Sequence, residues 1–200
     1  ASAGYADLPA AFFFAMSALF AWRLYRSGGA RDAALAGAMA GLAAWTKNGA
    51  LILAASLPAW VAYTRLRAHL WRGAPGEDGE VHPITTRRAA LMLGAMALVV
   101  GPWYARNLAL FGVLIPPTGW TWLAERTVGN LGPFLTYPNA YFVPGVVFTV
   151  GIAVSFWGAV RGHVGDALLV IFTGPLFVVW WALFSYETRF LLLILPLGAV

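Results

Sequence analysis

Five charged side chains are of the types that catalyse chemistry on a phosphate-linked group. A carboxylate can take a proton from an attacking hydroxyl or orient it, and cations can balance the negative charge that grows on a departing phosphate. Arg offers phosphate oxygens a bidentate fork, and Lys offers a compact point charge. The residues that could fill these roles lie next to apolar segments, and they are Asp7, Lys47, Arg106, Glu187 and Arg189.

Each of these residues also has a purely structural interpretation. Asp7 stands at the start of an apolar segment, where a carboxylate can cap a helix N-terminus. Lys47 and Arg106 could anchor helix ends at a membrane surface. Glu187 and Arg189 are two residues apart in YETR and could form an ion pair in a surface turn. Spacing alone leaves both interpretations open.

The composition indicates a membrane protein. Hydrophobic residues make up 60% of the chain and charged residues 10%, with a mean hydropathy of +0.73, whereas about a quarter of the residues in an ordinary soluble domain are charged. Several apolar stretches reach the roughly 18 residues that cross a bilayer as a helix, and the alternating segments of a transmembrane barrel are missing from the sequence. The predicted fold class is therefore all-α, a polytopic helical membrane protein.

About seven transmembrane segments are expected, at residues 8–25, 33–46, 50–63, 89–104, 142–160 and 167–184 and from residue 190 onward. The second contains Gly37 and Gly41 at the small-xxx-small spacing, which predicts an interior helix. The TKNG sequence at 46–49 predicts a tight surface turn. Residues 65–88 are predicted to form a cytoplasmic loop, and residues 107–141 an extracytoplasmic loop with an interfacial helix.

The distribution of the 13 Lys and Arg residues favours one orientation. If the first segment runs inward, the inner side receives nine: Arg23, Arg26, Arg31, Arg65, Arg67, Arg72, Arg87, Arg88 and Arg161. The outer side receives Lys47, Arg106, Arg126 and Arg189, in agreement with the positive-inside rule. The outer side also holds Asp7, Glu125 and Glu187. One outward rim thus mixes carboxylates and cations beside helices that could shelter a lipid tail.

Other chemistries have little support in the sequence. The chain has no cysteine, no Gly-rich phosphate loop and no HExxH motif, and its three histidines have no metal-ligand spacing. His163 belongs to a short inner turn in which Asp166 is expected to cap the next helix. The net charge of +5 comes without a basic patch interleaved with aromatics, so no nucleic-acid partner is expected.

Four segments resemble the membrane-embedded GT-C glycosyltransferases, and they are GYADLPAAFFFAMSALFAW, GLAAWTKNGALIL, GPWYARNLALFG and YETRFLLLILPLG. In particular they resemble bacterial proteins similar to the dolichyl-phosphate-mannose protein mannosyltransferases, glycosyltransferase family 39, and to the aminoarabinose lipid A transferases. The resemblance covers essentially the whole chain. It implies an enzyme that moves a sugar from a polyprenyl-phosphate carrier to an acceptor lipid, protein or polysaccharide on the outer face, usually with inversion.

The resemblance also implies roles for individual residues. Asp7 in YADLP matches an acidic position near the sugar or acceptor, and Glu187 accompanies it as a second catalytic carboxylate. Lys47 in TKNG matches a lysine that the family often carries as Thr-Lys-Gly. Arg106 in PWYARN and Arg189 in ETRF match cations that face the carrier phosphate, so donor-phosphate binding is expected at Lys47, Arg106 and Arg189.

The expected setting follows from the same resemblance. The chain starts without Met and stops inside an apolar run, so we expect a fragment whose parent carries further spans and an upstream extracytoplasmic loop with another acidic residue. We expect a multi-pass protein of a bacterial plasma membrane with an outward-facing site. No cofactor is required, and Mg²⁺ held by two or three acids is the alternative. The competing hypothesis is a transporter or flippase of lipid-linked sugars, or a non-catalytic membrane subunit.

Overall fold

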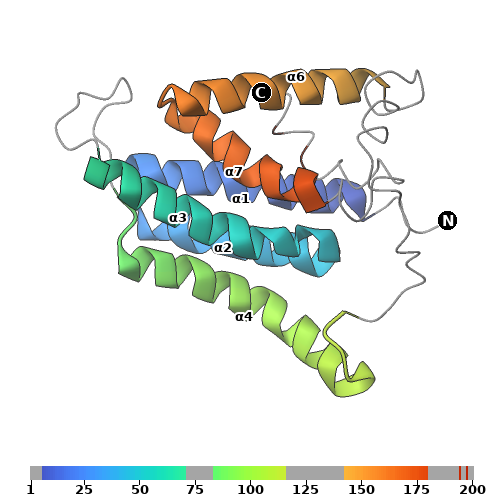
Figure 1. Ribbon diagram of the computed structural model, residues 1–200. Helices are drawn as coiled ribbons and strands as arrows, with labels where there is room; N and C mark the ends of the chain where they lie inside the picture. The colour runs from blue at the N-terminus through green and yellow to red at the C-terminus, as the bar shows by residue number, and fades with distance from the viewer. Residues whose placement is uncertain (1–5, 71–82, 116–141, 180–193, 195–196, 198–200) are drawn as a thin grey trace.

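The computed structural model describes residues 6–70, 83–115, 142–179, 194 and 197, with only the backbone for residues 142–149. Every element in these ranges is helical, which confirms the all-α fold class (Figure 1). The elements are α1 (Asp7–Ser27), α2 (Ala30–Thr46), the short 3-10 helix η1 (Asn48–Ile52), α3 (Leu53–Leu70), α4 (Thr86–Phe111), α6 (Phe142–Val160) and α7 (Val164–Val179).

The ends of these helices follow from local sequence. Gly28 ends α1 with φ +63° and donates its N–H to the Leu24 carbonyl, and Gly112 ends α4 in the same way with φ +69°. Glycine adopts this left-handed conformation without steric cost. Thr85 begins α4 because its hydroxyl accepts a hydrogen bond from the Arg88 N–H.

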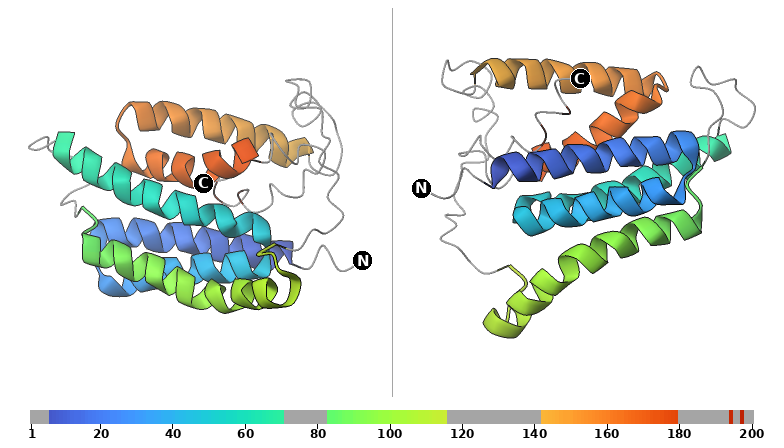
Figure 2. Two further views of the ribbon diagram at one scale, coloured as in Figure 1. Left: turned by 60° about the horizontal axis from the view of Figure 1, so that its bottom comes forward. Right: turned by 180° about the vertical axis from the view of Figure 1, so that it is seen from behind.

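Successive helices run in opposite directions, so their ends gather at two ends of the bundle (Figures 1 and 2). One end, here called the lysine end, holds the start of α1 and the last residues of α2 and α4, with Lys47 between α2 and η1. The opposite, arginine-rich end holds Arg23, Arg26, Arg31, Arg65, Arg67, Arg87, Arg88 and Arg161. Among the described residues, the charges lie at the two ends in the grouping that the sequence predicted.

Small residues let α2 pack closely between α1 and α4. A Cβ at Gly37 would lie 1.8 Å from the Met92 carbonyl oxygen, and a Cβ at Gly41 would lie 2.7 Å from the Val99 Cβ. On the other side of α2, the buried Ser17 hydroxyl donates to the Ala36 carbonyl at 2.9 Å. The small-xxx-small spacing therefore serves the helix packing that it predicted.

Larger apolar side chains point outward from this Ala-rich interior. Leu8 is 80% exposed, Leu98 78% and Val160 68%. Apolar side chains exposed on several helices suit contact with lipid tails, which are as apolar as Leu. Within the described ranges, three helices are long and apolar enough to cross a membrane: Asp7–Ser27, Asn48–Leu70 and Thr86–Phe111.

The expected seven segments are not confirmed, although the predicted 142–160 segment coincides with α6. The second predicted segment lies within α2, whose 17 residues fall short of the roughly 20 that a crossing needs. The predicted 167–184 segment begins inside α7, which is described only to Val179, and the segment from residue 190 lies outside the described ranges.

The predicted loop boundaries were wrong at three helix ends. α3 continues through Leu70, α4 begins at Thr86, and α4 then continues through Phe111. The charged residues Arg65 and Arg67 and the polar Asn107 suggested that loops begin there, yet neither 65–70 nor 107–111 contains Gly or Pro, so the helices extend. Arg65 also fixes the start of α4, because its guanidinium donates to the Ile84 carbonyl at 2.9 Å and to the Thr86 hydroxyl at 3.2 Å. Residues 71–82 and the predicted interfacial helix lie outside the described ranges.

Candidate functional site

Lys47 lies in a backbone position fixed from both sides. Its N–H donates to the Ala43 carbonyl at 2.9 Å and ends α2, while its own carbonyl accepts from the Ala50 N–H at 2.9 Å and begins η1. Between these bonds the residue is extended, with φ −148° and ψ 123°. The predicted break at TKNG is therefore present, and it holds Lys47 between two helices.

Asp7 and Lys47 form an ion pair across 40 residues of sequence, between Asp7 Oδ1 and Lys47 Nζ. The Asp7 side chain is 5% exposed and the Lys47 side chain 14%. Both charges are thus largely removed from water at the end of an apolar bundle. Ionisable groups in such places carry a large desolvation cost, which makes them candidates for function.

The structure shows neither a side-chain helix cap at Asp7 nor a solvent-directed anchor at Lys47. Asp7 is the first residue of α1, the N-cap is Ala6, and no side-chain capping bond is present at this helix start. The Asp7 carboxylate instead contacts Lys47, although it still lies in the first turn, where the helix dipole favours negative charge. Lys47 does not extend toward solvent as an interfacial anchor would.

Two residues that were not singled out from the sequence support the Lys47 position. The Tyr104 hydroxyl donates to Asn48 Oδ1 at 2.8 Å and lies 3.3 Å from the Ala44 carbonyl oxygen. These contacts attach α4 to both sides of Lys47. Tyr104 belongs to the PWYARN segment and Asn48 to TKNG, but their contact spans 56 residues and could not be read from either segment.

Arg106 lies at the lysine end but does not join the ion pair. Its side chain is exposed, and its guanidinium lies 5.5 Å from the centre of the Trp103 ring. A cation over an aromatic face is stabilised by the ring quadrupole, so this contact holds Arg106 at the rim. The structure therefore brings together Asp7 and Lys47 and leaves Arg106 on an outer face of α4.

The remaining predicted residues cannot be placed. Glu187 and Arg189, together with Glu125 and Arg126, lie outside the described residues. Within the described ranges, no three His, Asp, Glu or Cys side chains gather as a metal-binding group.

Asp166 was predicted to cap α7, and the described contacts give it another role. The His163 carbonyl accepts the Ala167 N–H at 3.1 Å, which makes His163 the residue before the first turn. Asp166 lies inside that turn, and its Oδ2 is 3.5 Å from His163 Nδ1.

No protein-family model matches this chain, and no curated protein or solved structure matches it.

Proposed function

We propose that this chain is part of a membrane-embedded glycosyltransferase of the GT-C type that takes its sugar from a polyprenyl-phosphate carrier. The observation that carries the proposal is the buried Asp7–Lys47 pair at one end of an apolar helical bundle. The pair supplies a carboxylate and a phosphate-binding cation in contact, next to helices long enough to lie beside a lipid carrier.

Charge distribution supports the proposed multi-pass topology with an outward lysine end. Eight of the nine arginines in the described ranges, all but Arg106, lie at the other end of the bundle, as the positive-inside rule expects of the cytoplasmic side. Arg106 at the rim is exposed, so its guanidinium is free to meet a phosphate that approaches along the bilayer surface.

The proposed reaction is a displacement at the anomeric carbon. An acceptor hydroxyl oxygen forms the new bond to that carbon, and the bond from the carbon to the carrier phosphate oxygen breaks. The hydroxyl proton passes to the Asp7 carboxylate, and the polyprenyl phosphate leaves with the electron pair. Lys47 holds the Asp7 carboxylate before substrate binds and then balances the charge on the departing phosphate, with Arg106 at the rim.

The test measures cleavage of the carrier by the intact protein in proteoliposomes. The probe is undecaprenyl-phosphate-[¹⁴C]mannose, with a bacterial membrane extract as the source of acceptors. The readout is label released from the carrier, separated by thin-layer chromatography, because transfer to a lipid, protein or polysaccharide breaks the bond between the sugar and the carrier phosphate. Lys47→Met and Asp7→Asn should each lower this rate by about 100-fold. Asp32→Asn is the matched control, since Asp32 is also a buried carboxylate, paired with Arg23 at 3.4 Å at the arginine-rich end.

Three results distinguish the hypotheses. Loss of release in the Asp7 and Lys47 variants, with the Asp32 variant retaining it, supports the proposal. Equal release by Asp7→Asn and the wild type refutes the catalytic role of the pair. Label that crosses the bilayer while still attached to its lipid indicates the flippase alternative.

A further inference from the structure

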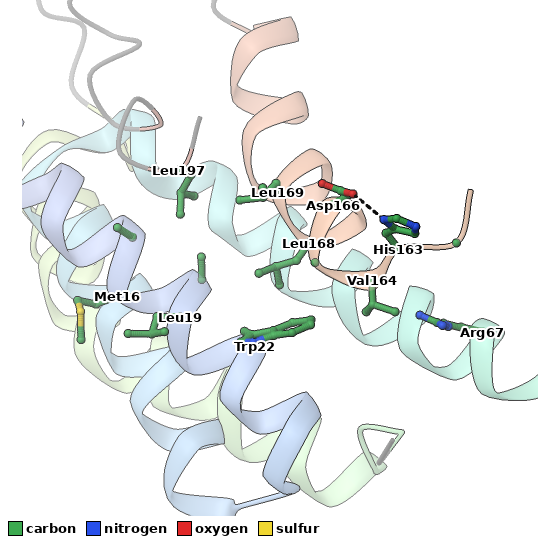
Figure 3. Close-up of a pocket in the computed structure, with 14 residues that line it drawn as sticks. Met16, Leu19, Trp22, Arg67, His163, Val164, Asp166, Leu168, Leu169 and Leu197 are labelled. Atoms are coloured by element: carbon green, nitrogen blue, oxygen red, sulfur yellow. Dashed lines mark ion pairs between the residues drawn. The ribbon is translucent and has the colours of Figure 1, made fainter. Parts of the chain in front are cut away.

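A pocket of about 640 Å³ lies near the arginine-rich end of the bundle, and neither Asp7 nor Lys47 lines it (Figure 3). α1 and the first turns of α7 form most of its wall, and Arg67 of α3 closes one side. Most of its lining is apolar, with Met16, Leu19, Trp22, Leu168 and Leu169 as the larger side chains. The volume lies within the roughly 300–1,000 Å³ of pockets that hold small molecules.

Polar groups gather on one side of this pocket, at Arg67, His163 and Asp166. The Asp166 carboxylate is already engaged in the turn, because its Oδ2 lies 3.5 Å from His163 Nδ1. It also lies against the backbone of α6, where a Cβ at Gly158 would be 1.8 Å from the same oxygen. Arg67 therefore remains as the cation of the pocket wall.

One nitrogen of Arg67 lacks a hydrogen-bond partner. Its Nη1 atom is buried and finds no acceptor within the described part of the chain. A buried guanidinium N–H without an acceptor is costly, and most such groups in folded proteins are paired. The guanidinium as a whole is a wall of the pocket and carries a fixed positive charge, so an anionic oxygen bound there would make a charge-assisted contact with it.

The two halves of the pocket together define the ligand. A purely apolar molecule would leave the charge of Arg67 on the pocket wall without an anion, and a soluble sugar or free phosphate would leave the Met, Leu and Trp wall unfilled. We propose that the pocket binds an anionic membrane phospholipid, with the phosphate on Arg67 and one acyl chain along the α1–α7 wall. Basic pockets between membrane helices recognise anionic lipid headgroups in this way, and the surrounding arginines favour the same charge.

The site is separate from the proposed sugar-transfer site, so either proposal can fail alone. The test is native mass spectrometry of the intact protein in detergent, titrated with dioleoyl-phosphatidylglycerol or with dioleoyl-phosphatidylcholine. The wild type should retain phosphatidylglycerol more tightly, and Arg67→Gln should weaken it about tenfold, as expected for one charge-assisted contact. Arg31→Gln is the control, since it removes one exposed charge at the same end and does not line the pocket.

A second variant tests the role of the apolar wall of the pocket. Ala15→Phe places a ring in the pocket and should abolish the phosphatidylglycerol preference, with circular dichroism and gel filtration to verify folding. If Ala15→Phe does not fold, the comparison of Arg67→Gln with the wild type still tests whether the pocket binds the lipid phosphate. The proposal is overturned if both lipids bind alike, if Arg31→Gln weakens binding as much as Arg67→Gln, or if millimolar inorganic phosphate alone displaces the lipid.

Discussion

At the residue scale, the contact between Asp7 and Lys47 has two separable contributions. It neutralises two charges that are largely buried, and removal of one partner from a buried ion pair destabilises a protein by about 3–5 kcal/mol. In the proposed reaction the same two groups also handle a proton and a phosphate. A single substitution removes both contributions, so loss of activity in a single variant does not separate stability from chemistry.

Exchange of the two residues separates these contributions. The double variant Asp7→Lys with Lys47→Asp keeps one charge of each sign in contact, so it should recover much of the thermal stability that either single variant loses. Its sugar-transfer rate should stay about 100-fold below the wild type, because the base and the phosphate-binding cation have changed places. Scanning fluorimetry and the release assay on the same samples measure both. Recovery of transfer together with stability would indicate that the pair is only structural.

At the element scale, the close approach of α2 to α4 fixes the segment that carries Lys47. Gly37 and Gly41 admit the backbone and side chains of α4, and Tyr104 then reaches Asn48 and Ala44 on either side of Lys47. Displacement of α4 should therefore disturb the site even though no residue of the ion pair has changed.

A pair of glycine substitutions tests this packing. Gly37→Ala puts a Cβ 1.8 Å from the Met92 carbonyl oxygen, and overpacking of this kind costs about 1–3 kcal/mol. Gly94→Ala in α4 is the control, because a Cβ there meets nothing within 4 Å and alanine favours the helix by about 1 kcal/mol. The melting temperature should fall for the first variant and stay equal or rise for the second. Equal melting temperatures would contradict the close packing.

The sequence predicted helices and their alternating directions better than it predicted contacts. The helix ends at Gly28 and in TKNG were predicted correctly, because they are set by the local sequence. The end of α3 was missed because the charged residues that extend it resemble a loop in composition, and the end of α4 was missed because the loop was taken to begin at Asn107, although apolar residues continue the helix to Phe111. Asp7 and Lys47 could be assigned to one end of the bundle from topology, but their contact, the exposed position of Arg106 and the Arg67 pocket depend on packing between distant segments.

At the scale of the whole molecule, the two ends differ in charge and in proposed use. The lysine end carries the ion pair and Arg106, and the arginine-rich end carries eight of the thirteen Lys and Arg residues, namely Arg23, Arg26, Arg31, Arg65, Arg67, Arg87, Arg88 and Arg161. Sugar transfer at an outward site requires that these ends face opposite sides of the membrane. This arrangement is the central claim, because the proposed outward reaction depends on it.

The most direct measurement is cysteine accessibility in intact cells, since the chain itself contains no cysteine. Single cysteines at Arg106 and Leu114 report on the lysine end, and those at Arg31 and Arg87 report on the other; all four side chains are exposed. In a cysteine-free background, a membrane-impermeant maleimide should label the first two in intact cells and the second two only after permeabilisation. The account would be contradicted if Arg31→Cys or Arg87→Cys were labelled in intact cells, or if both Arg106→Cys and Leu114→Cys were protected from the reagent.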